Sequence, residues 1–248
     1  MRIPVIHGVI DRRLLINFRV DPIVISRILP APFRPQLFQG QAIAGICLIR
    51  LKRIRPQFFP LPFGLGSENA AHRIAVELEV GGQTQCGVYI PRRDTSSRLN
   101  AWAGGTVFPG EHHHAKFVVS ESADRISVAV ASRDQRVQID VAGSIGTDLS
   151  ATSLFPNLSA ASDFFAQGAV GYSVTRDPGR YDGIELRCAN WSVTPLNIER
   201  VASSYFDDRR VFPEGSIQFD CALLMRGIEH EWHGQEDLCC EVANRTGS

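Results

Sequence analysis

The stretch LLINFRVDPIVISRILPAP, residues 14–32, sets the beginning of the fold. Its first part, Leu14–Val20, is rich in residues that favour extended backbone and predicts a strand. Asp21 then offers an N-cap oxygen and Pro22 suits the first position of a helix. Apolar residues at helical spacing follow over 23–29, and the next proline ends the helix. A strand that leads directly into a short helix is therefore the predicted opening unit.

The rest of the chain repeats short β-favouring runs between Gly, Pro and Asp turn signals. These predicted strands cover residues 41–54, 72–80, 86–91, 112–120, 124–132, 136–142, 170–175, 184–193, 197–203 and 217–226. Two further short helices are predicted at 96–103 and 158–167. The pattern predicts a mainly β (α+β) fold, a single antiparallel β-barrel or cone-like sheet of about ten strands with two or three short helices.

No linker, repeat or shift in composition divides the chain. We therefore expect one domain over residues 1–248, with a core at about 11–228 and a frayed polar tail at 229–248.

Composition excludes several classes of partner. The 248 residues carry a formal net charge of zero and are 44% hydrophobic, so we expect a sizeable core and no nucleic-acid partner. No apolar run is long enough for a membrane span, and the start of the chain lacks a signal-peptide pattern. Six cysteines without a CxxC pair fit a reducing compartment, so a cytoplasmic location is predicted.

Lys52 and Lys116 are the only lysines, which leaves two side chains for amine catalysis.

Several segments, in a common order, resemble the acetoacetate decarboxylase family. They are the Phe18–Asp21 strand end followed by Leu29-Pro30-x-Pro32, the block Phe108–Phe117, and the closing run Pro195–Ser204. The chain is closer still to a bacterial branch of that superfamily described only as a domain of unknown function, over roughly residues 11 to 233. The resemblance implies an acetoacetate decarboxylase-like fold, a small organic acid or ketone as ligand, and a homo-oligomer.

The chain departs from the family at its catalytic position. When Pro109 is placed on the family's proline, Gly110 and Glu111 stand where the family has two lysines. The first of those lysines forms an imine with the substrate, and the second lowers its pKa. Glycine offers no nucleophile, so an imine-forming decarboxylase is not expected. An acid/base catalyst of the lyase or hydrolase type remains compatible with the chain.

The run Glu111–His114 is the most unusual local chemistry. Because side chains alternate along a strand, Glu111 and His113 share one face while His112 and His114 share the other. We predict Glu111 and His113 as a catalytic acid/base pair, and His112 and His114 as substrate-binding residues. The alternatives are solvated histidines on a strand edge, or a metal held by His112 and His114. Two ligands hold a metal poorly, so no metal and no cofactor are predicted.

Glu68 and Arg73 are the other predicted substrate-binding residues. Arg73 could bind a carboxylate through paired hydrogen bonds, and Glu68 could be a carboxylate of the pocket. The alternative is that these two residues pair with each other or with neighbours to fix a loop. Arg12 loosely resembles an arginine near the family's entry strand, with an uncertainty of one residue.

Three functions stay open on the sequence alone. The first is an acid/base enzyme acting on a small organic acid or ketone. The second is a protein that binds such a ligand without turnover, and the third is a partner-binding module that uses the apolar loop at residues 58–63.

Overall fold

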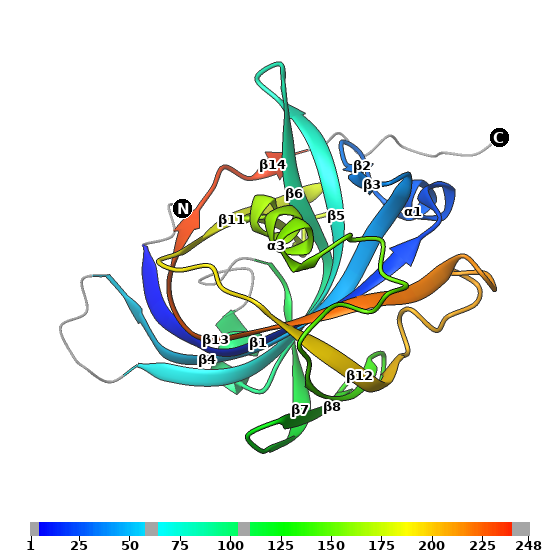
Figure 1. Ribbon diagram of the computed structural model, residues 1–248. Helices are drawn as coiled ribbons and strands as arrows, with labels where there is room; N and C mark the ends of the chain where they lie inside the picture. Colours follow the sequence, from blue (N-terminus) through cyan, green and yellow to red (C-terminus); the bar gives the residue numbers. More distant parts are fainter. Residues whose placement is uncertain (1–4, 58–63, 104–109, 240–248) are drawn as a thin grey trace.

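The computed structural model describes residues 5–57, 64–103 and 110–239, and strands dominate it (Figure 1). The helices found in these ranges are α1 Pro22–Ile28, α2 Arg98–Ala103 and α3 Leu158–Gln167. The strands are β1 Ile6–Val20, β2 Arg34–Pro35, β3 Leu37–Phe38, β4 Gln41–Pro56, β5 Leu65–Val80, β6 Gln83–Thr95, β7 His112–Glu121, β8 Arg125–Ser132, β9 Gln138–Ile145, β10 Val170–Val174, β11 Arg180–Cys188, β12 Thr194–Ser203, β13 Ile217–Gly234 and β14 Leu238–Cys239.

Within the described ranges, 14 strands form one hydrogen-bonded sheet. Most neighbouring strands are antiparallel, but β6 pairs in parallel with both β7 and β10. Additional pairings of β11 with β13 and of β5 with β6 connect the strand order back to itself. The predicted mainly β class with short helices is confirmed. The prediction of about ten strands in an all-antiparallel sheet is wrong, because three strands of two residues are too short to show a pattern and the sheet is mixed.

The opening unit has the predicted structure. The backbone N–H of Ile23 donates a hydrogen bond to the Asp21 side chain at 2.7 Å, and Pro22 begins α1.

The end of the chain differs from the prediction, because β13 continues to Gly234 where a frayed tail from Glu229 was expected. Residues 230–234 pair with β11, and His230 is buried, so this segment belongs to the folded part.

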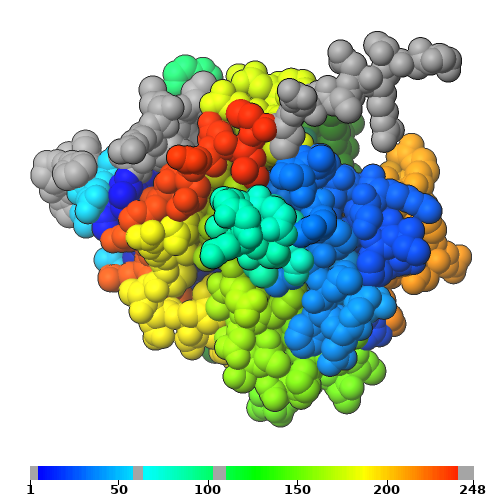
Figure 2. All heavy atoms as spheres, turned by 90° about the horizontal axis from the view of Figure 1, so that it is seen from above, coloured from blue at the N-terminus to red at the C-terminus, as the bar shows by residue number. Residues whose placement is uncertain are grey.

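The central strands bury side chains on both faces. Leu14 and Ile16 of β1 pack into one hydrophobic cluster, which continues into β8, β9 and β12. Leu15, between them, packs into a second cluster with Phe164 and Phe165 of α3. In Figure 1, α3 lies over the sheet, and Figure 2 shows it beside the tip of the β5–β6 hairpin. The molecule therefore has two apolar interiors that share the strands between them. None of the described helices is long and apolar enough to cross a membrane.

A buried histidine on β5 belongs to the first interior. The His72 ring is fully buried, and its Nε2 lies 3.1 Å from Ser203 Oγ. Burial, together with the nearby Arg92 charge, lowers the pKa of His72 to about 3. The imidazole is therefore neutral at pH 7.

We expect His72 to make the protein less stable in mild acid. Because its folded pKa lies below the unfolded value of about 6.5, the unfolded chain binds the extra proton as the pH falls through 6.5. At pH 5.5 this proton uptake by the unfolded chain lowers the free energy of unfolding by about 1.4 kcal/mol relative to alkaline pH. The value does not depend on the exact folded pKa as long as that pKa lies well below 5.5. Urea unfolding at pH 7.5 and 5.5 measures the loss, and His72→Gln should reduce the difference by about 1 kcal/mol. Ser203→Ala, which keeps the buried imidazole, should retain the full pH dependence; an undiminished difference in His72→Gln would show that His72 does not contribute to it.

Candidate functional site

A cavity of about 170 Å³ lies between α3 and the face of the sheet that carries the second cluster. Most of its wall is apolar and includes Leu15, Ala75, Ile90 and the two phenylalanines of α3. Three arginines also line it, one each from β1, β5 and β6: Arg13, Arg73 and Arg93. Cationic groups on an apolar wall are the feature that distinguishes this cavity from a packing defect.

Arg73 is the most buried of the three arginines, with 6% of its surface exposed. One Nη donates a hydrogen bond to Asn17 Oδ1, and the guanidinium carbon lies 5.0 Å from the centre of the Phe165 ring. Its Nε is buried and has no hydrogen-bond partner among the described residues. Burial lowers the pKa of Arg73 to about 10, so the side chain is still a cation at neutral pH.

Gly45 makes the contact between Arg73 and Asn17 geometrically feasible. It lies on β4, directly between its partners Asn17 on β1 and Arg73 on β5. A Cβ at this position would lie 2.4 Å from the backbone oxygen of Ile16 and 3.3 Å from Asn17 Oδ1. The missing side chain therefore lets β1 and β4 approach closely and lets Arg73 extend across β4.

Arg93 and His112 lie side by side on the paired strands β6 and β7. Arg93 Nε donates a hydrogen bond to Ser173 Oγ at 2.8 Å. His112 Nδ1 lies 3.0 Å from the Gly110 carbonyl oxygen. Because a carbonyl only accepts, Nδ1 carries the proton and Nε2 is left as an acceptor. Burial, and then the Arg93 charge, lowers the pKa of His112 to about 4, so this ring is neutral at pH 7.

Arg13 completes the cationic set. Its Nε donates to Cys47 Sγ at 3.3 Å, and its guanidinium lies 5.8 Å from the centre of the Trp191 ring. In the described ranges, no Asp or Glu lies within ion-pair distance of Arg13, Arg73 or Arg93; their partners are neutral groups. None of the three arginines on the cavity wall thus forms an ion pair with a described carboxylate.

The predicted pair Glu111 and His113 is brought together, but away from the cavity. His113 Nε2 lies 3.9 Å from a Glu111 oxygen, and His113 Nδ1 lies 3.7 Å from Asp134. Both side chains are partly exposed, and neither lines the cavity. Of the histidine run, His112 is the member on the cavity wall. His114 is not on that wall, and its Nδ1 is buried without a partner in the described part of the chain.

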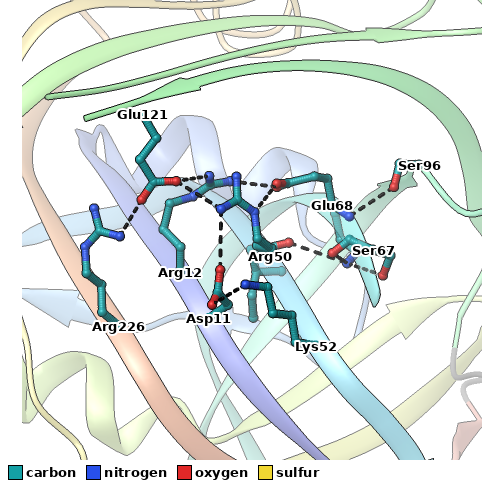
Figure 3. A network of polar contacts seen from close by, with 11 residues as sticks. Asp11, Arg12, Arg50, Lys52, Ser67, Glu68, Ser96, Glu121 and Arg226 are labelled. Atoms are coloured by element: carbon teal, nitrogen blue, oxygen red, sulfur yellow. Dashed lines mark hydrogen bonds and ion pairs between the residues drawn. The ribbon is translucent and has the colours of Figure 1, made fainter. Parts of the chain in front are cut away.

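Glu68 points to the opposite face of β5 from Arg73. Ser67 and Asn69, its neighbours on the strand, line the cavity, whereas Glu68 does not. Its carboxylate accepts hydrogen bonds from Arg12 and Arg50, each at 2.6 Å (Figure 3). Of the two alternatives for this residue, pairing with neighbours is therefore the one found, and Arg73 is not the partner.

The Glu68 carboxylate belongs to a larger ion-pair network that joins five strands (Figure 3). Arg12 and Arg50 also donate to Glu121 of β7, at 3.2 and 3.0 Å, and Arg226 of β13 pairs with the same carboxylate. Asp11 binds Arg50 and Lys52 at the edge of the network. Arg12, which resembles an arginine near the family's entry strand, is therefore part of this ion-pair network. Its neighbour Arg13 lies on the cavity wall instead.

Sequence reasoning missed Arg13, Arg93 and Asn17. Arg93 lies in the run Pro91-Arg-Arg-Asp94, where nothing local shows which arginine points inward. Among the described residues, no group of three or more His, Cys, Asp or Glu side chains is arranged to hold a metal ion.

The fold is similar to that of solved acetoacetate decarboxylase-like enzymes. Acetoacetate decarboxylase from Legionella pneumophila superposes with a TM-score of 0.60 at 10% identity, over 94% of this chain and 87% of that one. The enduracididine biosynthesis enzyme MppR gives 0.59 at 13% identity, over 96% and 89%. An acetoacetate decarboxylase-like enzyme from Sphingomonas wittichii RW1 gives 0.56 at 11% identity, over 96% and 93%.

At such identities the likeness shows the fold alone. No curated protein matches the sequence significantly. The family model of DUF2071, described as an uncharacterized conserved protein, matches residues 10–222. Since this match spans most of the sequence, the chain belongs to the DUF2071 family and has an acetoacetate decarboxylase-like fold.

Proposed function

We propose that the protein binds a small organic acid in the cavity beneath α3, with Arg73 as the main carboxylate-binding residue. A guanidinium offers a carboxylate two parallel hydrogen bonds, and these are strong in an apolar surrounding. The apolar wall would hold the carbon skeleton of the acid. MppR, which shares the fold, has been solved in complex with pyruvate, and this supports a small acid as ligand class.

The observation that carries the proposal is the buried Arg73 cation. An unpaired charge in an apolar interior is costly, and a bound anion would offset that cost. Arg73 lines the cavity, and its buried Nε has no hydrogen-bond partner among the described residues. Asn17 and Phe165 hold the guanidinium in place without neutralising it.

Acid/base turnover of the bound acid or of a ketone is the second candidate, and His112 supports it. This neutral imidazole lies on the cavity wall and keeps one ring nitrogen free to accept a proton. Glu111 and His113, predicted for this role, do not line the cavity, so we propose His112 in their place. Imine chemistry is not proposed, because neither Lys52 nor Lys116 lines the cavity.

Binding is tested by calorimetric titration with short carboxylic acids and with the matching amides. We expect an acid to bind while its amide does not, because the guanidinium selects for negative charge. Arg73→Gln should weaken acid binding by at least about 30-fold, the factor that corresponds to 2 kcal/mol.

The control is Arg34→Gln, which removes an exposed arginine paired with Glu79 and should leave acid binding unchanged. Equal affinity for acid and amide, or unchanged affinity in Arg73→Gln, would contradict the proposal. Turnover would appear as a chemical change in the bound acid that His112→Gln abolishes.

A further inference from the structure

Two of the three cavity arginines, Arg73 and Arg93, extend toward different strands. Arg73 is anchored to Asn17 on β1, and Arg93 is anchored to Ser173 on β10. Arg73 and Arg93 come from the adjacent strands β5 and β6, but their anchoring residues are farther apart, because β4, β5 and β6 lie between β1 and β10 in the sheet. Adjacent strands lie about 4.8 Å apart, which separates the two anchors by several such steps along the curved sheet.

Small side chains adjoin the two arginines in the sheet. Cys47 of β4 pairs with Ala71 of β5, and Ala71 pairs with Arg93 of β6. Both Cys47 and Ala71 line the cavity. A cavity of about 150 Å³ lined by aliphatic and aromatic side chains accommodates benzene. The 170 Å³ here is therefore suited to a compact chain of a few carbons between the two cations.

The nearest carboxylates do not neutralise these cations. Asp94 adjoins the cavity, but it accepts hydrogen bonds from Arg92, the closest at 2.8 Å. Asp182 accepts the backbone N–H of Gly110 at 2.8 Å; it acts electrostatically on Arg93 but forms no ion pair with it. His112, which lies beside Arg93, adds no negative charge either. Arg73 and Arg93 thus contribute two positive charges without an ion-paired carboxylate, and Arg13 is a further cation on the wall.

We propose that the ligand is an aliphatic dicarboxylate of about four to six carbons, with one carboxylate at Arg73 and the other at Arg93. This deepens the proposed function and rests on it, since both assign the same cavity to an organic acid. A single carboxylate would leave one of the two cations without a counter-charge. A dianion with separated ends compensates both.

The test is calorimetric titration with succinate, glutarate and adipate, each compared with its monomethyl ester. The ester keeps nearly the same carbon chain and carries one charge less. We expect at least one dicarboxylate to bind about 10- to 100-fold more tightly than its ester, the range of one charge-assisted hydrogen-bonded contact. The best chain length then reports the spacing of the two guanidinium groups.

Two variants assign the ends. Arg93→Gln should reduce the preference for the dicarboxylate to within about threefold, while Arg93→Lys, which keeps the charge, should retain most of it. Arg73→Gln should weaken the dicarboxylate and the ester together. The melting temperature of each variant shows that it is folded.

The remaining outcomes overturn either the dicarboxylate inference or the proposed function. Equal binding of ester and dicarboxylate would refute the dicarboxylate inference and leave the organic-acid pocket standing. Tighter binding of phenyl phosphate than of any dicarboxylate would also refute it, because the charge would then be concentrated at one end. No binding of any acid or ester would refute the proposed function itself.

Discussion

Arg12→Met is expected to lower the free energy of unfolding by about 3 kcal/mol, the lower part of the range for breaking a buried ion pair. The Arg12 side chain is fully buried and donates to both Glu68 and Glu121. Its removal leaves two partly buried carboxylates with fewer donors. Arg50 still contacts both of them, which keeps the loss below the maximum.

Thermal and urea unfolding measure this loss. At this chain length about 3 kcal/mol corresponds to a fall of roughly 6–12 °C in melting temperature. Arg226→Gln is the matched control, because Arg226 binds the same Glu121 carboxylate but is 40% exposed. Its cost should stay below about 1 kcal/mol. Similar losses of unfolding free energy in the two variants would show that the burial of Arg12 does not increase its contribution to stability.

Gly45→Ala is expected to lower the free energy of unfolding by up to about 3 kcal/mol, the upper part of the range for overpacking. The added Cβ would lie 2.4 Å from the Ile16 carbonyl oxygen, which is backbone and cannot rotate away. The strands β1 and β4 must then move apart. Because Asn17 and Arg73 meet across Gly45, the variant should also weaken organic-acid binding about as much as Arg73→Gln does.

Gly66→Ala is the control for this prediction. Gly66 is exposed on β5, and its nearest contact would be the Leu51 oxygen at 3.2 Å. Its effect should stay within about 0.5 kcal/mol. Urea unfolding and calorimetric titration measure stability and acid binding in both variants. Equal stability and equal acid binding would mean that the close approach of β1 and β4 at Gly45 affects neither property.

Local signals in the sequence predicted local structure well. The Asp21-Pro22 pair predicted the start of α1, and alternating apolar residues predicted most strands at their observed places. Strand pairing is a different matter, because the parallel contacts of β6 with β7 and β10 depend on connections that carry no periodic pattern. The two-residue strands carry no pattern at all.

The candidate site shows the same limit. Alternation predicted that His112 and His113 point to opposite sides, but it could not decide which one points inward. That choice depends on the register of β7 against β6, where Arg93 pairs with His112. Arg73 was predicted as a carboxylate-binding residue and lies on the cavity wall; its binding role stays a prediction. Glu68 was predicted to bind substrate together with Arg73. The two residues are five positions apart on one strand, and an odd spacing places their side chains on opposite faces.

The two faces of β5 have consequences for how such a protein changes during evolution. Ser67, Asn69, Ala71 and Arg73 line the cavity, whereas Glu68 and His72 make their contacts on the other face of the strand. A substitution at an odd-numbered position can therefore alter ligand choice with little disturbance of the ion pairs and packing behind it. Descendants of one ancestor could exchange their chemistry in this way while their strands stayed in place.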